Sequence, residues 1–497
     1  MRVALDYLAI AVLAACGGAQ NASHSAAQPS AEEAQYPALH WAPDAPTYLV
    51  TAPRVRDAQR AIRDLVDSLG MVGRVTPEEL GSAARELLGV DPLGDEVATK
   101  LGVDLDGGIA MFSESWSPTF VVHLAAPATT RAFFAHLRDL GMHSTAQTID
   151  GIDVASAPLR EGLVASWAID GDWFWFHLAS DDFGETEAPG AWLVHARHRT
   201  KPGWSDALAW AAGLARDAKP LVGFWNSHAV LAATMSRLHK HAAGDIDACI
   251  AQLETVERVG ITVDGDGTHA AGKLAFDLGS AAPRIASAIL PPPPGFAALA
   301  ANAPLALQWN VDVAKAADAL APCLRVFGTE PHELAQTGVR SARVLLETFD
   351  PDGPSGTGAV ALDLSSREKV GQLVDEIPRL AVQTDRSFGT YHGRHVAIPF
   401  VASLDYVLDD TIALAAMGDG LLDQLVAGTP PANAPLFAID VRPPGLPERS
   451  WQYLLHEVFG SHGGKLVTSQ LLKWRDGHIA LTIDQNALVL DASGNRR

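Results

Sequence analysis

The chain has 497 residues, of which 48% are hydrophobic and 19% are charged, a composition typical of folded globular proteins. Its 58 acidic and 37 basic side chains give a formal net charge of −21. Such a charge repels the phosphate backbone, so we expect no nucleic-acid partner. The length exceeds what one hydrophobic core usually holds, so we expect more than one domain.

The N-terminal residues combine a weakly basic start with a short apolar run. Arg2 precedes the run at residues 8–15, which is too short to cross a bilayer of about 30 Å as a helix. The run ends in Leu13-Ala14-Ala15-Cys16, which resembles the lipobox of bacterial lipoproteins. The resemblance implies a signal peptide at residues 1–15 and acyl chains such as palmitate on Cys16. Because Gly17 and not Asp follows the cysteine, it also implies anchoring at the outer membrane, facing the periplasm or the cell surface.

Residues 16–40 contain mainly small and polar side chains. A segment of this composition buries too little apolar surface to order itself. We therefore predict a flexible tether between the lipidated cysteine and the folded part of the chain.

Four later segments share one pattern. Each begins with a proline, continues with a short β-prone run and passes into an Ala/Leu-rich helical pattern. A predicted pair of strands follows, and the first three pairs are followed by another helical pattern. We predict a unit of strand, helix, hairpin and helix, repeated about four times with a truncated last copy. The segments begin at Ala45, Lys219, Ala303 and Ala434, and the predicted hairpins span residues 108–125, 256–277, 339–363 and 465–483.

Four consecutive prolines occupy residues 291–294. A stiff polyproline segment continues no helix and cannot pair inside a sheet, so we place the main domain boundary there and expect few contacts across it. The predicted halves are residues 41–290 and 296–497. Hairpins outnumber strand–helix–strand crossovers, which predicts an α+β fold with mainly antiparallel sheets and packed helices.

A short motif resembles a known group of proteins. Gly89-Val90-Asp91-Pro92 precedes a glycine-rich strand pattern, and together they are similar to an uncharacterised family of secreted bacterial repeat proteins. The resemblance supports an envelope or secreted location and implies no activity.

Once Cys16 is lipidated, Cys249 and Cys323 remain. In an oxidising compartment such a pair can form a disulfide. The alternative is that both thiols are buried and pack as small hydrophobic side chains. The sequence leaves both open.

Several motif fragments lack the residues that their chemistry requires. His456 and His462 are six residues apart, whereas two zinc ligands on one helix are four apart. Ser366 and Lys369 match the start of a serine acyltransferase motif whose other parts are missing. We therefore predict no catalytic residue, no metal site and no cofactor.

Aromatic residues gather in one predicted strand. Trp173, Trp175 and His177 alternate with Phe174 and Phe176, so both faces of the strand are apolar. Such a strand is either buried on both faces or lines a ligand groove with one of them. The candidate groove residues are Trp167, Trp173, Trp175 and His177.

These features favour a non-enzymatic, lipid-anchored envelope protein that binds a partner protein or an apolar ligand through its first half. One alternative is an envelope hydrolase whose active site is dispersed along the sequence and so invisible to motifs. Another is a structural or assembly factor of the outer membrane.

Overall fold

The computed structural model describes residues 34–73, 79, 81–82, 85, 90–113, 117–160, 162–180, 204–214, 221–227, 256–316, 338–353, 356–375, 382–398 and 402–497. Cys16, Cys249 and Cys323 lie outside these residues, so lipidation and the disulfide stay predictions. Internal contacts divide the chain into two compact units, residues 1–240 with 256–275 and residues 241–255 with 276–497. None of the described helices has both the length and the hydropathy needed to span a membrane.

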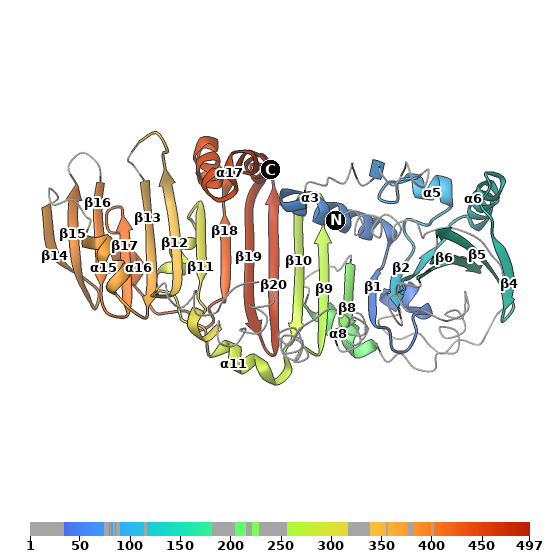
Figure 1. The fold of residues 1–497 in the computed structure, drawn as a ribbon, viewed down its shortest axis with the longest axis horizontal. Coiled ribbons are helices and arrows are strands. Elements are labelled where there is room, and N and C mark those ends of the chain that lie inside the picture. The colour runs from blue at the N-terminus through green and yellow to red at the C-terminus, as the bar shows by residue number, and fades with distance from the viewer. Residues whose placement is uncertain are drawn as a thin grey trace. The chain divides into compact units, whose positions relative to one another are not determined.

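The first unit is built on an antiparallel sheet (Figure 1). Its strands are β1 (Tyr48–Ala52), β2 (Ile109–Ser113), β3 (Thr119–His123), β4 (Thr145–Ile149), β5 (Ile152–Arg160), β6 (Leu163–Asp170), β7 (Trp173–Ser180), β8 (Leu221–Asn226), β9 (Arg258–Gly265) and β10 (His269–Asp277). Neighbouring strands follow the order β4, β5, β6, β7, β3, β2, β1, β8, β9, β10. Its helices are η1 (Pro37–Trp41), α3 (Val55–Gly73), α5 (Glu96–Leu101), α6 (Pro127–Asp139) and α8 (Ser205–Gly213).

Hydrophobic clusters cover both faces of the central strands in the first unit. One cluster joins Leu49 of β1 and Trp175 of β7 to Leu208 of α8. The other joins Phe174 of β7 to Leu101 of α5. Successive side chains of a strand point to opposite faces, so the neighbours Phe174 and Trp175 enter different clusters. This strand therefore contributes to core packing on both of its faces.

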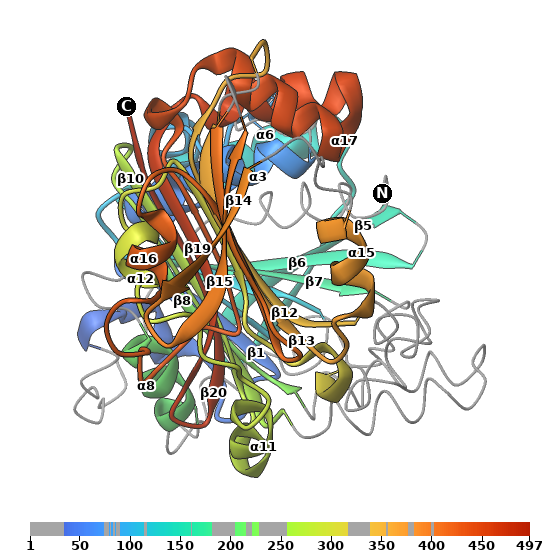
Figure 2. The ribbon, with the colours of Figure 1, turned by 90° about the vertical axis from the view of Figure 1, so that its left-hand side faces the viewer.

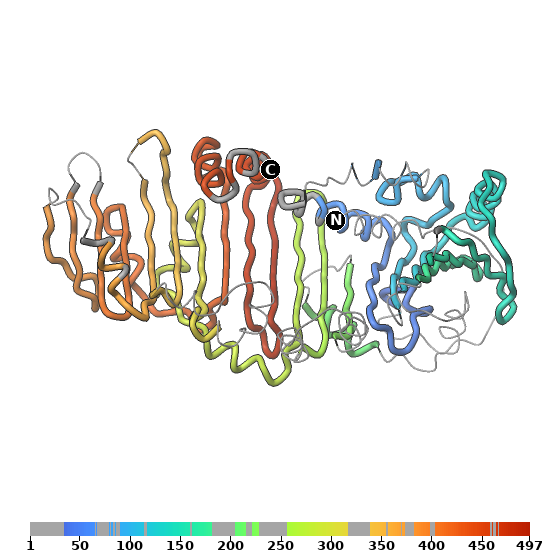
Figure 3. Tube along the Cα trace, in the orientation of Figure 1, coloured from blue at the N-terminus to red at the C-terminus, as the bar shows by residue number. Residues whose placement is uncertain are grey.

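The second unit also contains an antiparallel sheet, whose strands can be followed along the Cα trace in Figure 3. They are β11 (Leu305–Trp309), β12 (Val339–Phe349), β13 (Gly356–Leu364), β14 (Val382–Phe388), β15 (Tyr391–Ile398), β16 (Ala402–Leu408), β17 (Ile412–Met417), β18 (Phe437–Val441), β19 (Trp474–Asp484) and β20 (Ala487–Arg496). Neighbouring strands follow the order β14, β15, β16, β17, β13, β12, β11, β18, β19, β20.

The helices of the second unit pack on this sheet from different sides. They are η3 (Gly279–Ala281), α11 (Ala282–Ala286), α12 (Phe296–Ala300), α15 (Glu368–Asp375), α16 (Leu421–Val426), η4 (Pro443–Gly445) and α17 (Glu448–Leu471). Figure 2 shows α12 and α16 on one face of the sheet and α15 on the other. Phe296 of α12 and Leu422 of α16 join Leu345 of β12 in one cluster. Trp451 of α17 belongs to another.

The predicted α+β class with mainly antiparallel sheets is confirmed, and strands occupy more of the described chain than helices do. Two predicted segments differ from the structure. The end of the predicted tether is folded, because Pro37–Trp41 form η1 and Leu39 is 0% exposed. Residues 465–471 were expected to begin a strand but form the end of α17, and the last hairpin consists of β19 and β20 instead. The backbone leaves helical geometry at Gly460 (φ 71°, ψ 173°), so the helical segment bends there and then continues to Leu471.

The four-proline segment is not an open spacer. Pro292 and Pro293 are buried, and the Gly295 N–H donates to the Leu425 carbonyl at 2.9 Å. The contacts divide the chain between residues 275 and 276, so residues 291–294 lie inside the second unit. The observed division thus falls before the predicted boundary, and the segment expected to be a spacer is packed. Proline has no N–H to satisfy, so such a segment can be buried wherever its carbonyls find donors.

Candidate functional site

The aromatic strand predicted to line a groove is β7, and most of its side chains belong to the core. Trp175 is 0% exposed, and its ring meets Trp41 edge to face at a centroid distance of 4.6 Å. Trp167 on β6 is 6% exposed and stacks on Phe134 at 4.6 Å. Both tryptophans are therefore packed against other aromatic rings and do not form an accessible wall.

The two remaining groove candidates are also held by protein groups. His177 is 5% exposed, and its Nδ1 lies 2.9 Å from the Thr119 hydroxyl. Trp173 is half-buried and contacts His123 edge to face at 5.0 Å. β7 lies between β3 and β6, so neither of its edges is open, and two hydrophobic clusters cover its faces. We therefore interpret these four residues as part of the core and not as the wall of a ligand groove.

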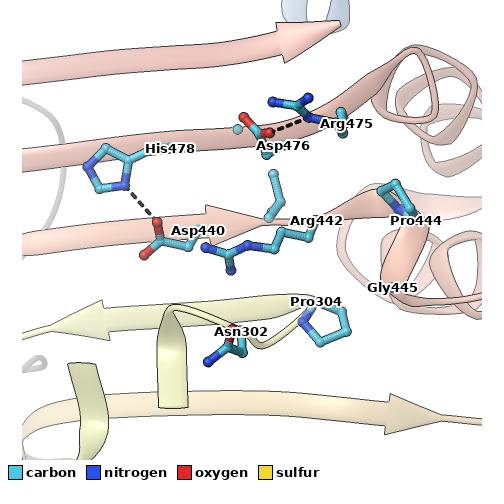
Figure 4. Close-up of a pocket in the computed structure, with 11 residues that line it drawn as sticks. Asn302, Pro304, Asp440, Arg442, Pro444, Gly445, Arg475, Asp476 and His478 are labelled. Carbon is cyan, nitrogen blue, oxygen red and sulfur yellow. Dashed lines mark hydrogen bonds and ion pairs between the residues drawn. The ribbon is translucent and has the colours of Figure 1, made fainter. Parts of the chain in front are cut away.

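A polar pocket of about 580 Å³ lies in the second unit (Figure 4). Charged side chains of β18 and β19 and of the residues that flank them form much of its wall, and the loop before β11 completes it. Sequence motifs did not indicate this pocket. It is lined by Asn302, Pro304, Asp440, Val441, Arg442, Pro444, Gly445, Arg475, Asp476, Gly477 and His478.

A histidine–aspartate pair forms one side of the pocket. Asp440 and His478 lie directly opposite each other in the β18–β19 register, so both side chains stand on the same face of the sheet. His478 Nδ1 is 2.8 Å from Asp440 Oδ1. The side chains are 43% and 22% exposed respectively, so the pair is open to solvent from the pocket side.

The carboxylate changes the protonation of the histidine. The hydrogen bond from Asp440 raises the pKa of His478, and the negative charges of Asp440 and Asp491 act in the same direction. Partial burial and the positive charge of Arg442 oppose this rise. The net effect favours the imidazolium form, which can donate from both ring nitrogens.

Two arginines complete the polar surface. Arg442 Nη1 donates to the carbonyls of Ala300 and Ala303 at 2.9 and 2.8 Å, which holds its side chain along the pocket wall. Arg475 is 66% exposed, and its Nε donates to Asp476 at 3.0 Å. Asp476 also accepts from Asn495 at 2.6 Å. Although burial opposes it, these bonds lower the pKa of Asp476 and keep it ionised.

Among the residues that the structure describes, those lining the pocket offer hydrogen-bond donors and acceptors but include no Ser, Thr or Cys side chain. Within the described ranges, no group of three or more His, Cys, Asp or Glu side chains is placed to hold a metal ion. His478 and Asp440 have the geometry of a base and the carboxylate that orients it. The arrangement can bind polar groups, and it can take up or release a proton at His478.

Comparisons of the sequence with known proteins identify no relative. No family model matches the sequence, and no curated protein matches it. Three crystal forms of TP0453 are similar among solved structures. Form III has 8% identity and a TM-score of 0.28, covering 49% of this chain and 80% of that one. Form I has 10% identity and a TM-score of 0.27, covering 50% of this chain and 81% of that one. Form IV has 8% identity and a TM-score of 0.28, covering 52% of this chain and 87% of that one. At such TM-scores the similarity establishes no common fold.

Proposed function

We propose that the protein is a lipid-anchored component of the bacterial envelope that binds a polar ligand or partner group in the pocket at β18 and β19. The observation that carries the binding site is the His478–Asp440 pair at an open pocket. The lipobox-like motif that ends in Cys16 supports the anchor. The net charge of −21 argues against nucleic acid as the partner.

The chemistry of the pocket favours a polar ligand over the apolar one expected from the aromatic strand. An apolar molecule seated there would separate Arg475, Asp440 and His478 from water without offering them hydrogen bonds, which is costly. A ligand that carries both donors and acceptors would replace the lost water contacts. Binding through the second unit therefore replaces binding through the first half.

The test is to identify what copurifies with the protein by untargeted mass spectrometry, comparing wild type with His478→Ala. His143→Ala is a suitable control, because His143 is an exposed histidine of the first unit. We expect a molecule that is retained by wild type and by the control but lost from His478→Ala. If all three preparations carry the same molecules, or none, the pocket is not the binding site, and an assembly role becomes the better description.

A hydrolase is the second candidate, and the same pair supports it. A neutral His478 held by Asp440 could act as a general base toward water. Because no hydroxyl or thiol side chain lines the described pocket, the nucleophile would have to be water. The assay is cleavage of a panel of ester and amide substrates, under conditions where a bound ligand is retained. Cleavage by wild type but not by His478→Gln would favour this candidate.

The four predicted repeats are also part of the proposal. When β1 to β10 are renumbered as β11 to β20, the strand orders of the two units become the same. Within each unit a proline-led strand from one predicted copy pairs with that of the next, β1 with β8 and β11 with β18. This correspondence supports two similar halves, each made from two copies of one unit.

A further inference from the structure

A second polar pocket, of about 660 Å³, lies on β14, β15 and β16 of the second unit. In the strand register Asp385 is opposite Arg394, and Arg394 is opposite Tyr406, so these side chains stand on one face of the sheet. Helix α15 begins next to Arg367, which also lines the pocket. The lining residues are Arg367, Asp385, Arg386, Ser387, His392, Gly393, Arg394, Tyr406 and Leu408.

Positive charge is concentrated here in a chain that is strongly acidic as a whole. Arg386 is held by Asp423 at 2.6 Å and by Asp405 at 3.5 Å, so Arg367 and Arg394 supply the available positive charge. The acids that approach these two arginines do so weakly. Asp385 is 95% exposed and lies 3.6 Å from Arg394, and Asp410 is 81% exposed and lies 3.5 Å from Arg367. Exposed pairs at such distances contribute little to stability. An anionic ligand could therefore displace these acids at small cost.

The pocket also has neutral donors and a buried wall. Tyr406 is only 8% exposed, so its ring forms a fixed surface. Ser387 and His392 face each other across β14 and β15, with His392 Nδ1 3.2 Å from the serine hydroxyl. Arg394 also donates to Gln383 at 3.1 Å, which orients its guanidinium. Donors of several kinds thus line one small region.

We propose that this pocket binds the phosphate group of a small phosphorylated molecule. Planar guanidinium groups bind oxyanions through paired N–H donors. Two arginines, a hydroxyl and an imidazole match the three terminal oxygens of a phosphate monoester better than the two oxygens of a carboxylate. The net charge of −21 opposes approach to an anionic membrane surface, which favours a soluble ligand. This site is separate from the pocket at β18 and β19 and does not depend on its function.

The experiment is isothermal titration calorimetry with inorganic phosphate and with glycerol phosphate, on the chain made without residues 1–16. Arg394→Gln and Arg367→Gln should each weaken phosphate binding at least tenfold. Both side chains are more than half exposed, at 54% and 58%, so we expect the variants to fold, and circular dichroism checks this. Arg449→Gln is the matched control, because Arg449 is an exposed arginine of the same unit that pairs with Asp350 and Asp352 outside the pocket. It should bind phosphate like wild type.

Vesicles separate the two sources of phosphate. Wild type should bind soluble phosphate and show no preference for phosphatidylglycerol over phosphatidylcholine vesicles. Binding only to the phosphatidylglycerol vesicles would overturn the proposal in favour of a lipid headgroup. The absence of soluble phosphate binding in wild type, or equal binding by all three arginine variants, would also overturn it. Because none of these substitutions touches His478, the result is independent of the ligand search described for the first pocket.

Discussion

Buried Arg343 gives the sharpest test of how the second unit is held together. The residue is 1% exposed, and burial lowers the pKa of its guanidinium although Asp363 acts against this. Its Nε donates to Asn310 Oδ1 at 2.6 Å, and its Nη1 donates to Asp363. Its Nη2 donates to the carbonyls of Leu290 and Pro291 at 2.8 and 3.3 Å. One side chain therefore ties the four-proline segment to β12, to β13 and to the residue that follows β11.

The substitution Arg343→Met keeps an unbranched apolar stem and removes every one of these donors. The Oδ1 of Asn310, which is 0% exposed, would lose the Arg343 donor, and the Leu290 carbonyl would lose a side-chain donor. Removing one partner of a buried ion pair typically costs about 3–5 kcal/mol. In a unit of this size, each kcal/mol corresponds to about 2–4 °C in Tm. We therefore expect the transition of the second unit to fall by roughly 6–20 °C.

Arg449→Met is the control, because Arg449 is 56% exposed and makes two ion pairs, with Asp350 and Asp352. Exposed pairs contribute at most about 1 kcal/mol each, so this variant should lose at most about 2 kcal/mol, less than the roughly 3–5 kcal/mol expected for Arg343→Met. Differential scanning calorimetry of both variants measures the difference. Equal shifts would refute the reasoning, since the number of ion pairs and not their burial would then determine the cost.

The other predictions concern the core of the first unit, the anchor, the four-proline segment and the histidine of the pocket. Trp175→Ala should destabilise the first unit by about 3–5 kcal/mol, more than Trp173→Ala, and equal urea midpoints would contradict the core assignment. Cys16→Ser should leave an uncleaved precursor or release the protein from the membrane fraction; unchanged fractionation would exclude the lipoprotein assignment. Limited proteolysis should spare residues 291–295, and rapid cleavage there would show that the segment is open. Because the pKa of His478 is raised in the folded state, its positive charge stabilises the fold fully below a pH of about 6.5. This stabilisation is lost as the pH rises through the pKa of the folded state. His478→Gln should therefore flatten the dependence of the urea midpoint on pH in this range, and an unchanged profile would contradict the pairing.

Local patterns predicted most strands, because alternation and turn residues are local properties. The predicted hairpin at residues 339–363 corresponds to β12 and β13, and that at residues 256–277 to β9 and β10. The last predicted hairpin, at residues 465–483, was misplaced, and Gly477 shows why. In the structure it pairs with Gly494 inside the sheet, and the true turn includes Gln485 at φ 52°, a residue type that gives no turn signal.

The polar pocket could not be predicted in the same way. Asp440 and His478 are 38 residues apart in sequence, and α17 intervenes between their strands. Only the register of β18 with β19 places them opposite each other. For the aromatic strand, the sequence indicated the character of its two faces but not what covers them. Its alternation correctly indicated that both faces are apolar, but whether a face meets a core or a ligand depends on α8 and α5, which pack against it from elsewhere in the chain.

The two units differ in where one helix packs on the sheet. In the first unit α8 packs on β8 and β9, and Gly260 of β9 leaves room for Trp210 of that helix, since a Cβ there would lie 2.7 Å from its ring. In the second unit α16 occupies the same place in the chain order but packs on β13, β14 and β17. The strands that correspond to β8 and β9 in chain order are β18 and β19, which carry Asp440 and His478. The two units thus share one strand order, while this helix packs on different strands.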